Sequence, residues 1–183
     1  AAENALALLH RHDREKLSEE NRLTYDVLES YLEHSLRASA YGLYEEPLAP
    51  LTGTQAQLPV LLSEYQFYDT TDVDIYLRLL TQVPEYFQSI LEFETARSEQ
   101  GLFMSASSAD DIVTECQAFI DLGKDNYLYS SFEERLEPLG LTDDQKKSYC
   151  EKNTEIIESS VFPAYQTLKK GIAGLRSTGK NSC

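Results

Sequence analysis

The chain has 183 residues, of which 42% are hydrophobic and 10% aromatic, a balance that argues against intrinsic disorder. A domain of this length buries roughly 70% of the surface of its unfolded chain, so a sizeable core is expected. The formal net charge is −15, with 31 acidic and 16 basic residues and no basic run, which argues against nucleic acid or an anionic membrane surface as a partner. No apolar run approaches the roughly 20 residues that a transmembrane helix needs.

Two helices are predicted in the amino-terminal part. The first spans residues 3–11, and the second begins after Ser18, a residue type that favours helix N-caps. The second helix is expected to end near Gly42, because glycine adopts the left-handed turn that closes many helices. Apolar residues recur in it at steps of three and four, which indicates an apolar face. This stripe consists of Leu23, Val27, Leu28, Tyr31, Leu32 and Leu36.

Residues 43–58 are predicted to form one long irregular loop. Pro47, Pro50 and Gly53 interrupt any regular element there. Pro59 is then expected in the first turn of a helix that runs to about Phe67, because the missing proline N–H has no helical partner in a first turn anyway.

Two further helical segments are predicted before residue 124. Thr71 opens the first of them, in which Pro84 either kinks the helix or starts a second one, and Gly101 ends it. Ser108 opens the next helix, which runs to about Gly123.

The carboxy-terminal part is predicted to hold a short and a long helix. Ser131 opens the short helix, which Pro138 and Gly140 end. Thr142 opens the long one, and Pro163 is expected to bend it. Acidic pairs fall in the first turns of several predicted helices, where the helix dipole favours negative charge. These pairs are Asp72 and Asp74, Asp110 and Asp111, and Asp143 and Asp144.

The helical signals together predict an all-α fold. No run alternates apolar and polar residues as a strand would, and no repeat of fixed length occurs. We expect an irregular helical bundle of about six to eight helices with one long loop that contains proline and glycine, folded as a single domain over residues 1–183.

The histidines do not form a metal-binding pattern. A zinc-protease helix needs His-Glu-x-x-His, which places two imidazoles on one helix face. His10 and His12 are two residues apart and point to different sides of a helix, and His34 has Tyr31 rather than Glu three residues before it. Surface histidines are the simpler interpretation.

The aspartates at positions 69, 72 and 74 do not match a calcium-binding loop. An EF-hand needs a central glycine and a distal glutamate, and neither follows Asp69, Asp72 and Asp74 at the required spacing. Helix capping explains these three carboxylates better.

Nucleophile and phosphate-site patterns are equally incomplete. Cys116 and Cys150 are flanked by Glu115 and Glu151 rather than by basic residues, so buried structural thiols are expected. No Gly-x-Ser-x-Gly elbow occurs. Residues 174–180 match the start of a P-loop, but the next residue is not Ser or Thr and the segment follows a helix rather than a strand. We therefore assign no catalytic, cofactor-binding or metal-binding residue in this chain.

Several short segments between residues 23 and 179 resemble a bacterial family of unknown function, DUF885. The segments are LTYDVL (23–28), PLTGTQAQLP (50–59), DIYL (74–77), VPEYF (83–87), GLFM (101–104) and VFPAY (161–165). The chain looks closest to members from Gram-positive gut anaerobes. Family members look like zinc metallopeptidases of the gluzincin type, whose His-Glu-x-x-His-like motif lies in the carboxy-terminal half.

The resemblance implies a non-catalytic, helical amino-terminal part of a zinc-dependent peptidase, which forms one wall of the substrate cleft. Zinc is then expected in a carboxy-terminal part that this chain lacks, and the implied partners are that catalytic part and a peptide substrate. An exported or lipid-anchored location is also implied. The abrupt end at Cys183 suggests a truncated boundary, and an apolar face left by the cut would allow dimerisation.

The alternative is a peptide-binding or protein-binding scaffold without enzymatic activity. Paired helices with a groove lined by tyrosine could hold a peptide or a partner helix. The sequence alone does not separate this alternative from the peptidase interpretation.

Overall fold

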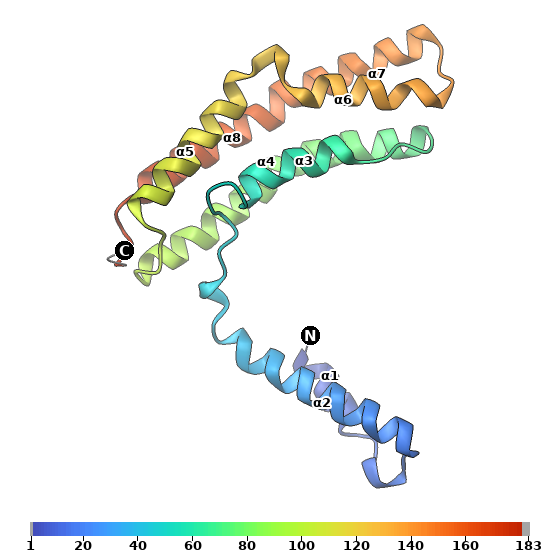
Figure 1. Cartoon of the computed structure of the whole chain (residues 1–183), viewed down its shortest axis with the longest axis vertical. Coiled ribbons are helices and arrows are strands. Elements are labelled where there is room, and N and C mark those ends of the chain that lie inside the picture. The colour runs from blue at the N-terminus through green and yellow to red at the C-terminus, as the bar shows by residue number, and fades with distance from the viewer. Residues whose placement is uncertain (1, 181–183) are drawn as a thin grey trace. The chain divides into compact units, whose positions relative to one another are not determined.

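The computed structural model describes residues 2–180, in which α-helices are joined by loops and short 3₁₀ turns and no strand occurs (Figure 1). The predicted all-α class is confirmed. The helices are α1 (Ala2–Leu9), α2 (Glu19–Ser39), α3 (Thr54–Glu64), α4 (Thr70–Glu99), α5 (Ala106–Asp121), α6 (Tyr127–Leu136), α7 (Asp143–Ile156) and α8 (Phe162–Leu175). None of these described helices is long and apolar enough to cross a membrane. Cys183 lies outside the described residues.

The contacts divide the chain into two compact units. The first is Ala1–Glu45 and contains α1 and α2, and the second is Glu46–Cys183 and contains α3 to α8. The single domain expected over residues 1–183 stays a prediction.

The first unit is a pair of helices, α1 packed on α2. As predicted, Ser18 caps α2, and its side chain accepts a hydrogen bond from the backbone N–H of Asn21. Helix α2 ends at Ser39 with Ala40 as its C-cap, close to the predicted end near Tyr41 and Gly42, and Gly42 begins a 3₁₀ turn (Gly42–Tyr44). Gly42 is not among the residues with positive φ, so the left-handed turn that motivated the prediction does not form there.

The predicted apolar stripe of α2 forms, but most of it is exposed. Tyr25 is the buried residue of α2. Leu23, Val27 and Tyr31 are spaced four residues apart and therefore share one helix face. Their exposed fractions are 67%, 59% and 67%, so this face has no packing partner among the described residues of the first unit.

The long predicted loop is shorter than expected, because α3 begins at Thr54 rather than at Pro59. Gly53 is the N-cap, and a Cβ atom there would lie 2.2 Å from the backbone nitrogen of Ala49, which only glycine avoids. Pro59 lies inside the helix and cannot donate to the carbonyl of Gln55 four residues earlier. The Tyr165 hydroxyl of α8 donates to that carbonyl at 2.7 Å and replaces the missing bond.

Replacing Tyr165 with phenylalanine should lower the free energy of unfolding by about 1–3 kcal/mol, because the buried Gln55 carbonyl then loses its donor. The Pro59→Ala substitution restores a backbone N–H at that position. In the double variant the loss should therefore be smaller than for Tyr165→Phe alone. Urea unfolding of the four proteins measures this coupling, and strictly additive effects would contradict the proposed replacement.

Helix α4 is one continuous helix with Pro84 in its interior, so the second of the two predicted alternatives, a new helix at Pro84, is wrong. It is capped by Asp69, which forms a capping box with Asp72, and it begins at Thr70, one residue before the predicted start at Thr71. The predicted end is confirmed. Gly101 has a φ of 72°, and the N–H groups of Gly101 and Leu102 donate to carbonyls of the last turn.

The next two helices start earlier than predicted. Helix α5 is capped by Ser105 rather than Ser108, and α6 is capped by Asn126 rather than opened near Ser131. The Asn126 side chain accepts from the N–H of Leu128 and also donates to the carbonyl of Phe119 in α5. It therefore both starts α6 and ties it to the preceding helix.

Thr142 opens α7 with a capping box, as predicted. Near Pro163 the chain does not break but widens into a π-helical segment (Ile157–Val161), after which α8 follows directly. The N–H of Phe162 donates to the carbonyl of Ile157, five residues back. Pro163 explains this widening, because its ring would clash with the Ser159 carbonyl in a regular α-helix.

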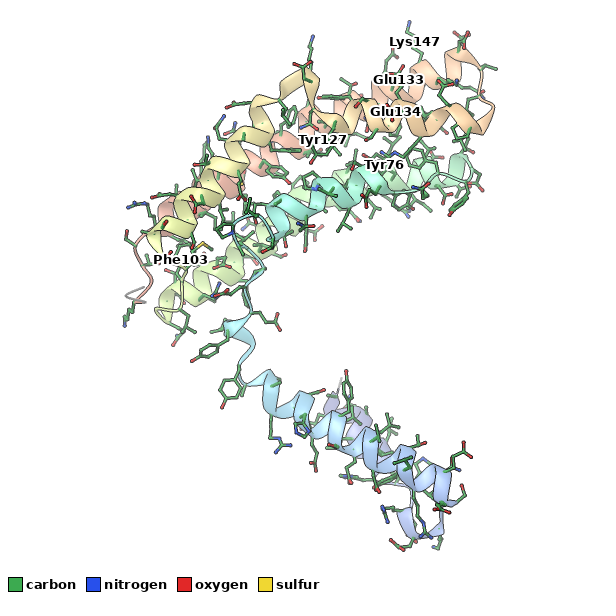
Figure 2. All side chains as sticks on the ribbon, viewed as in Figure 1. Tyr76, Phe103, Tyr127, Glu133, Glu134 and Lys147 are labelled. Atoms are coloured by element: carbon green, nitrogen blue, oxygen red, sulfur yellow. The ribbon has the colours of Figure 1, made fainter. Side chains whose placement is uncertain are left out.

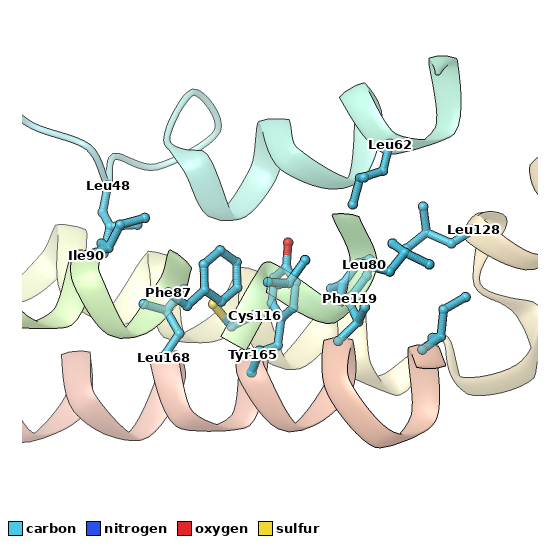
Figure 3. Packing of buried hydrophobic residues seen from close by; sticks show 14 of the residues in the cluster. Leu48, Leu62, Leu80, Phe87, Ile90, Cys116, Phe119, Leu128, Tyr165 and Leu168 are labelled. Atoms are coloured by element: carbon cyan, nitrogen blue, oxygen red, sulfur yellow. The ribbon is translucent and has the colours of Figure 1, made fainter. Parts of the chain in front are cut away.

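The core of the second unit forms where α8 packs against α4 and α5 (Figure 3). The Tyr165 ring lies between Phe87 and Phe119, with centroid distances of 4.9 Å and 4.2 Å. Helix α3 packs against α5 and α6, and α6 packs against α7. A cavity lies between α6 and α7.

Candidate functional site

The three histidines lie in the first unit and their side chains are exposed, as predicted. His10 contacts the Glu29 carboxylate at 2.8 Å, and His34 forms a hydrogen bond with the Ser30 carbonyl of its own helix. Among residues 2–180 no three His, Cys, Asp or Glu side chains come together as metal ligands. Asp69 and Asp72 cap α4, as the capping interpretation predicts. The prediction that the chain carries no catalytic, cofactor or metal residue stays a prediction.

The two described cysteines are free thiols. Cys116 is fully buried in α5, and burial, with a smaller contribution from the Glu115 charge, raises the pKa of its thiol to about 12. Cys150 in α7 is half-buried. The expected structural role fits Cys116 well, whereas Cys150 borders a cavity.

In the native protein at pH 8, Cys116 should react with iodoacetamide at least about tenfold more slowly than Cys150, because both thiolate formation and access are suppressed at Cys116. Mass spectrometry of the two cysteine-containing peptides over time measures the rates. Unfolding in urea should make the rates similar. Equal rates in the folded protein would show that Cys116 is accessible.

The segment resembling a P-loop contains the end of α8 and the residues after it. Gly174 lies in α8, and Ser177 adopts a positive φ of 72°. At Gly179 an added Cβ would lie 2.3 Å from the carbonyl oxygen of Phe103, so the glycine serves close packing. The segment follows helix α8 rather than a strand, which differs from the context of a phosphate loop.

A cavity of about 330 Å³ lies between α6 and α7 in the second unit. Phe132 and Asn153 are its buried members, and Tyr129, Cys150 and Thr154 are half-buried. Three charged side chains complete its lining: Lys124, Glu133 and Glu158. Its size and its mixture of apolar wall and few polar groups are typical of a small-molecule site.

The negative charges of Glu133 and Glu158 raise the pKa values of two other residues that line this cavity. The pKa of the Tyr129 hydroxyl is raised by burial and further by the charge of Glu158. The pKa of the Cys150 thiol is raised by burial and further by the charge of Glu133. Because negative charge disfavours a phenolate or a thiolate beside it, the cavity suits a cation better than an anion.

The hollow continues along the same helix pair. A neighbouring space of about 390 Å³ shares Glu133 and Cys150 and extends to Glu137 and Lys147. Figure 2 shows Glu133 on α6 and Lys147 on the adjacent α7. No motif in the sequence indicates this groove, although the capping box at Thr142 indicates the start of α7.

A buried ion pair lies on α4, away from the α6–α7 cavity. Glu94 is 0% and Arg97 3% exposed, and the Arg97 Nη1 atom donates to both Glu94 carboxylate oxygens at 3.0 Å and 3.1 Å. The Arg97 Nη2 atom also lies 3.5 Å from the Glu46 carboxylate. Burial raises the pKa of Glu94, and the Arg97 charge opposes that rise. The pair holds the segment at Glu46 against α4.

Comparison with known proteins gives one family and one fold. The family profile described as bacterial protein of unknown function, DUF885, matches residues 1–180. A candidate lipoprotein from Colwellia psychrerythraea has a similar solved structure, with a TM-score of 0.69 and 21% sequence identity. The match covers 74% of this chain and 24% of that one, so this chain spans about a quarter of its length. No curated protein matches the chain.

Proposed function

Because the chain belongs to the bacterial family DUF885, we propose that it is a non-catalytic helical part of a zinc-dependent peptidase and forms one wall of the substrate cleft of that enzyme. The zinc ligands and the general base belong, in this proposal, to a catalytic part in the remainder of a longer protein. There zinc would activate the water that attacks the peptide carbonyl. The residues of this chain would bind and orient substrate.

The observation that carries the proposal is the exposed apolar face of α2. Leu23, Val27 and Tyr31 are more than half exposed although they form a continuous stripe. Apolar stripes of this kind are typical of surfaces that pack against further protein. The similar structure, about four times as long as the stretch it shares with this chain, supports a larger assembly that would cover the stripe.

An extracytoplasmic location is part of the same proposal. The similar structure is that of a candidate lipoprotein, which supports export or lipid anchoring of this protein as well. We propose a Gram-positive host on the resemblance of the short sequence segments.

A second candidate function is a scaffold that binds a peptide or a partner protein without chemistry. The groove between α6 and α7 favours it, because two connected hollows run along one helix pair and share Glu133 and Cys150. The groove would need no reactive group to bind a peptide.

The test uses the longer protein that, in this proposal, contains both this chain and the catalytic part. It is purified with and without zinc and incubated with a mixture of peptides. We expect hydrolysis that is lost on chelation and restored by zinc. The variant Val27→Glu should reduce hydrolysis or stability by placing a charge in the covered stripe, whereas Glu33→Gln on the same helix should not. Peptide binding without hydrolysis by the zinc-loaded protein would instead favour the scaffold.

A further inference from the structure

Residues 176–180, which follow α8, lie against the connection between α4 and α5 (Figure 1). We call these five residues the strap. The backbone N–H of Lys180 donates to the carbonyl of Gly101 at 3.0 Å, and the Ser98 hydroxyl donates to the Thr178 hydroxyl at 2.7 Å. The strap therefore ties the end of α8 to the end of α4.

A glycine allows the strap to approach this connection closely. A Cβ atom added at Gly179 would lie 2.3 Å from the carbonyl oxygen of Phe103, so any larger residue at this position excludes the strap from the place that it occupies. The side chain of Lys180 lies over Gly101. Gly179 and Lys180 are the last two residues of the segment that resembles a P-loop, and here both serve the contact with the α4–α5 connection.

An ion pair holds the first residue of the strap. The Arg176 Nε and Nη2 atoms donate to the two carboxylate oxygens of Asp110 in α5 at 2.6 Å and 2.7 Å. The two side chains are 48% and 53% exposed, so solvent and salt screen the attraction between them. The ion pair fixes the start of the strap, and the Lys180 bond fixes its end.

The strap has no buried side chain to anchor it. Four of its residues are exposed and Gly179 is half-buried, whereas Leu168 and Ile172 in the preceding helix are fully buried. Ser177 also adopts a φ of 72°, which residues other than glycine rarely adopt. Regions with few buried apolar contacts open at a small fraction of the free energy of global unfolding. Release of the strap should therefore cost much less than unfolding of α8.

We propose that the strap opens and closes as one element on the folded second unit, with the Arg176–Asp110 pair as its latch. Closing pairs the Gly101 carbonyl and covers the backbone at Phe103. Opening leaves α4, α5 and α8 packed on one another. Because the latch is a half-exposed ion pair, the closed fraction falls as the salt concentration rises. This device lies within the second unit and does not depend on the proposed peptidase function.

Hydrogen exchange of the whole chain, followed by nuclear magnetic resonance, tests the proposal. We expect the Lys180 amide to exchange at least about tenfold more slowly than in an unstructured peptide, but at least about a hundredfold faster than the Leu168 amide of α8. Raising the salt concentration from about 0.02 M to about 0.5 M should lower the protection of Lys180 about threefold and leave that of Leu168 unchanged. An unprotected Lys180 amide, or one as slow as Leu168, would overturn the proposal.

Variants of the latch form a double-mutant cycle. Arg176→Gln and Asp110→Asn should each lower the protection of the Lys180 amide about threefold, and the double variant should lower it no further, because either change alone breaks the pair. The matched control is Glu137→Gln, which breaks the 2.7 Å ion pair with Lys146 away from the strap and should have less than about a 1.5-fold effect.

Gly179→Ala tests the closed position independently of charge. The added methyl group should reduce the protection of the Lys180 amide to less than about twofold while Leu168 stays protected. Additive effects of the two latch variants, or full protection of Lys180 in Gly179→Ala, would show that the strap does not close in the way proposed.

Discussion

Replacing Arg97 with methionine should destabilise the second unit by about 3–5 kcal/mol, because the fully buried carboxylate of Glu94 would lose the guanidinium that donates to both of its oxygens. The loss should depend on pH. Burial already raises the pKa of Glu94, and the opposing charge of Arg97 would be gone in the variant. A carboxyl group with a raised pKa in the folded state reduces stability as pH rises above its unfolded value, roughly 4.3, so the deficit should shrink on acidification towards pH 4.

Urea unfolding of the variant and the unchanged protein between pH 4 and pH 7 measures both effects. The double variant Glu94→Leu/Arg97→Met is the control, since it removes both charges and should recover most of the lost stability. Glu46→Gln changes an exposed carboxylate near Arg97 and should have a small effect. A deficit that stays constant with pH would show that Glu94 is not the source of the loss.

Replacing Phe132 with alanine should lower the free energy of unfolding by about 3–5 kcal/mol, which is the usual cost of removing a buried aromatic ring. The Phe132 ring packs against Phe67 and Tyr76 at centroid distances of 5.5 Å each. Arg135 lies over the rings of both of these partners, so the loss would also loosen the contact between α6 and the end of α3.

The matched control is Tyr68→Ala, which removes an aromatic ring that is 85% exposed and should change stability by less than about 0.5 kcal/mol. Thermal unfolding followed by circular dichroism compares the two variants. Similar transition temperatures for both would mean that the cluster around Phe132 contributes little to the core.

Local signals in the sequence predicted the helical class and several helix ends. Ser18 and Thr142 cap their helices as expected, because each N-cap side chain satisfies an N–H of its own first turn. The Gly101 end is equally local, since it needs only one residue that tolerates positive φ. At these three boundaries the identity of one residue was enough.

Boundaries that depend on distant partners could not be predicted. Pro59 is tolerated inside α3 because Tyr165, 106 positions later, donates to the carbonyl that proline leaves unpaired. The start of α6 at Asn126 was different: asparagine is a favoured N-cap residue and its side chain accepts from the N–H of Leu128, so a local signal was present and was overlooked. At Pro59 the local signal pointed to a later start, and a tertiary hydrogen bond outweighed it.

The candidate site could not be predicted from the sequence either. Its lining residues carry no motif, because they come from two helices and lie together only in the folded chain. The stripe of α2 shows the reverse case: the periodicity of Leu23, Val27 and Tyr31 predicted a face correctly, but periodicity does not tell whether that face is covered.

The π-helical segment before Pro163 limits where members of the family can gain or lose residues. Residues 157–161 hold one residue more than a regular helix would, and this sets the rotation of Ala164, Leu168 and Ile172 towards α4 and α5. Deleting one residue there would turn that buried row by about 100° and expose it. Insertions and deletions among homologous sequences should therefore be absent from this turn.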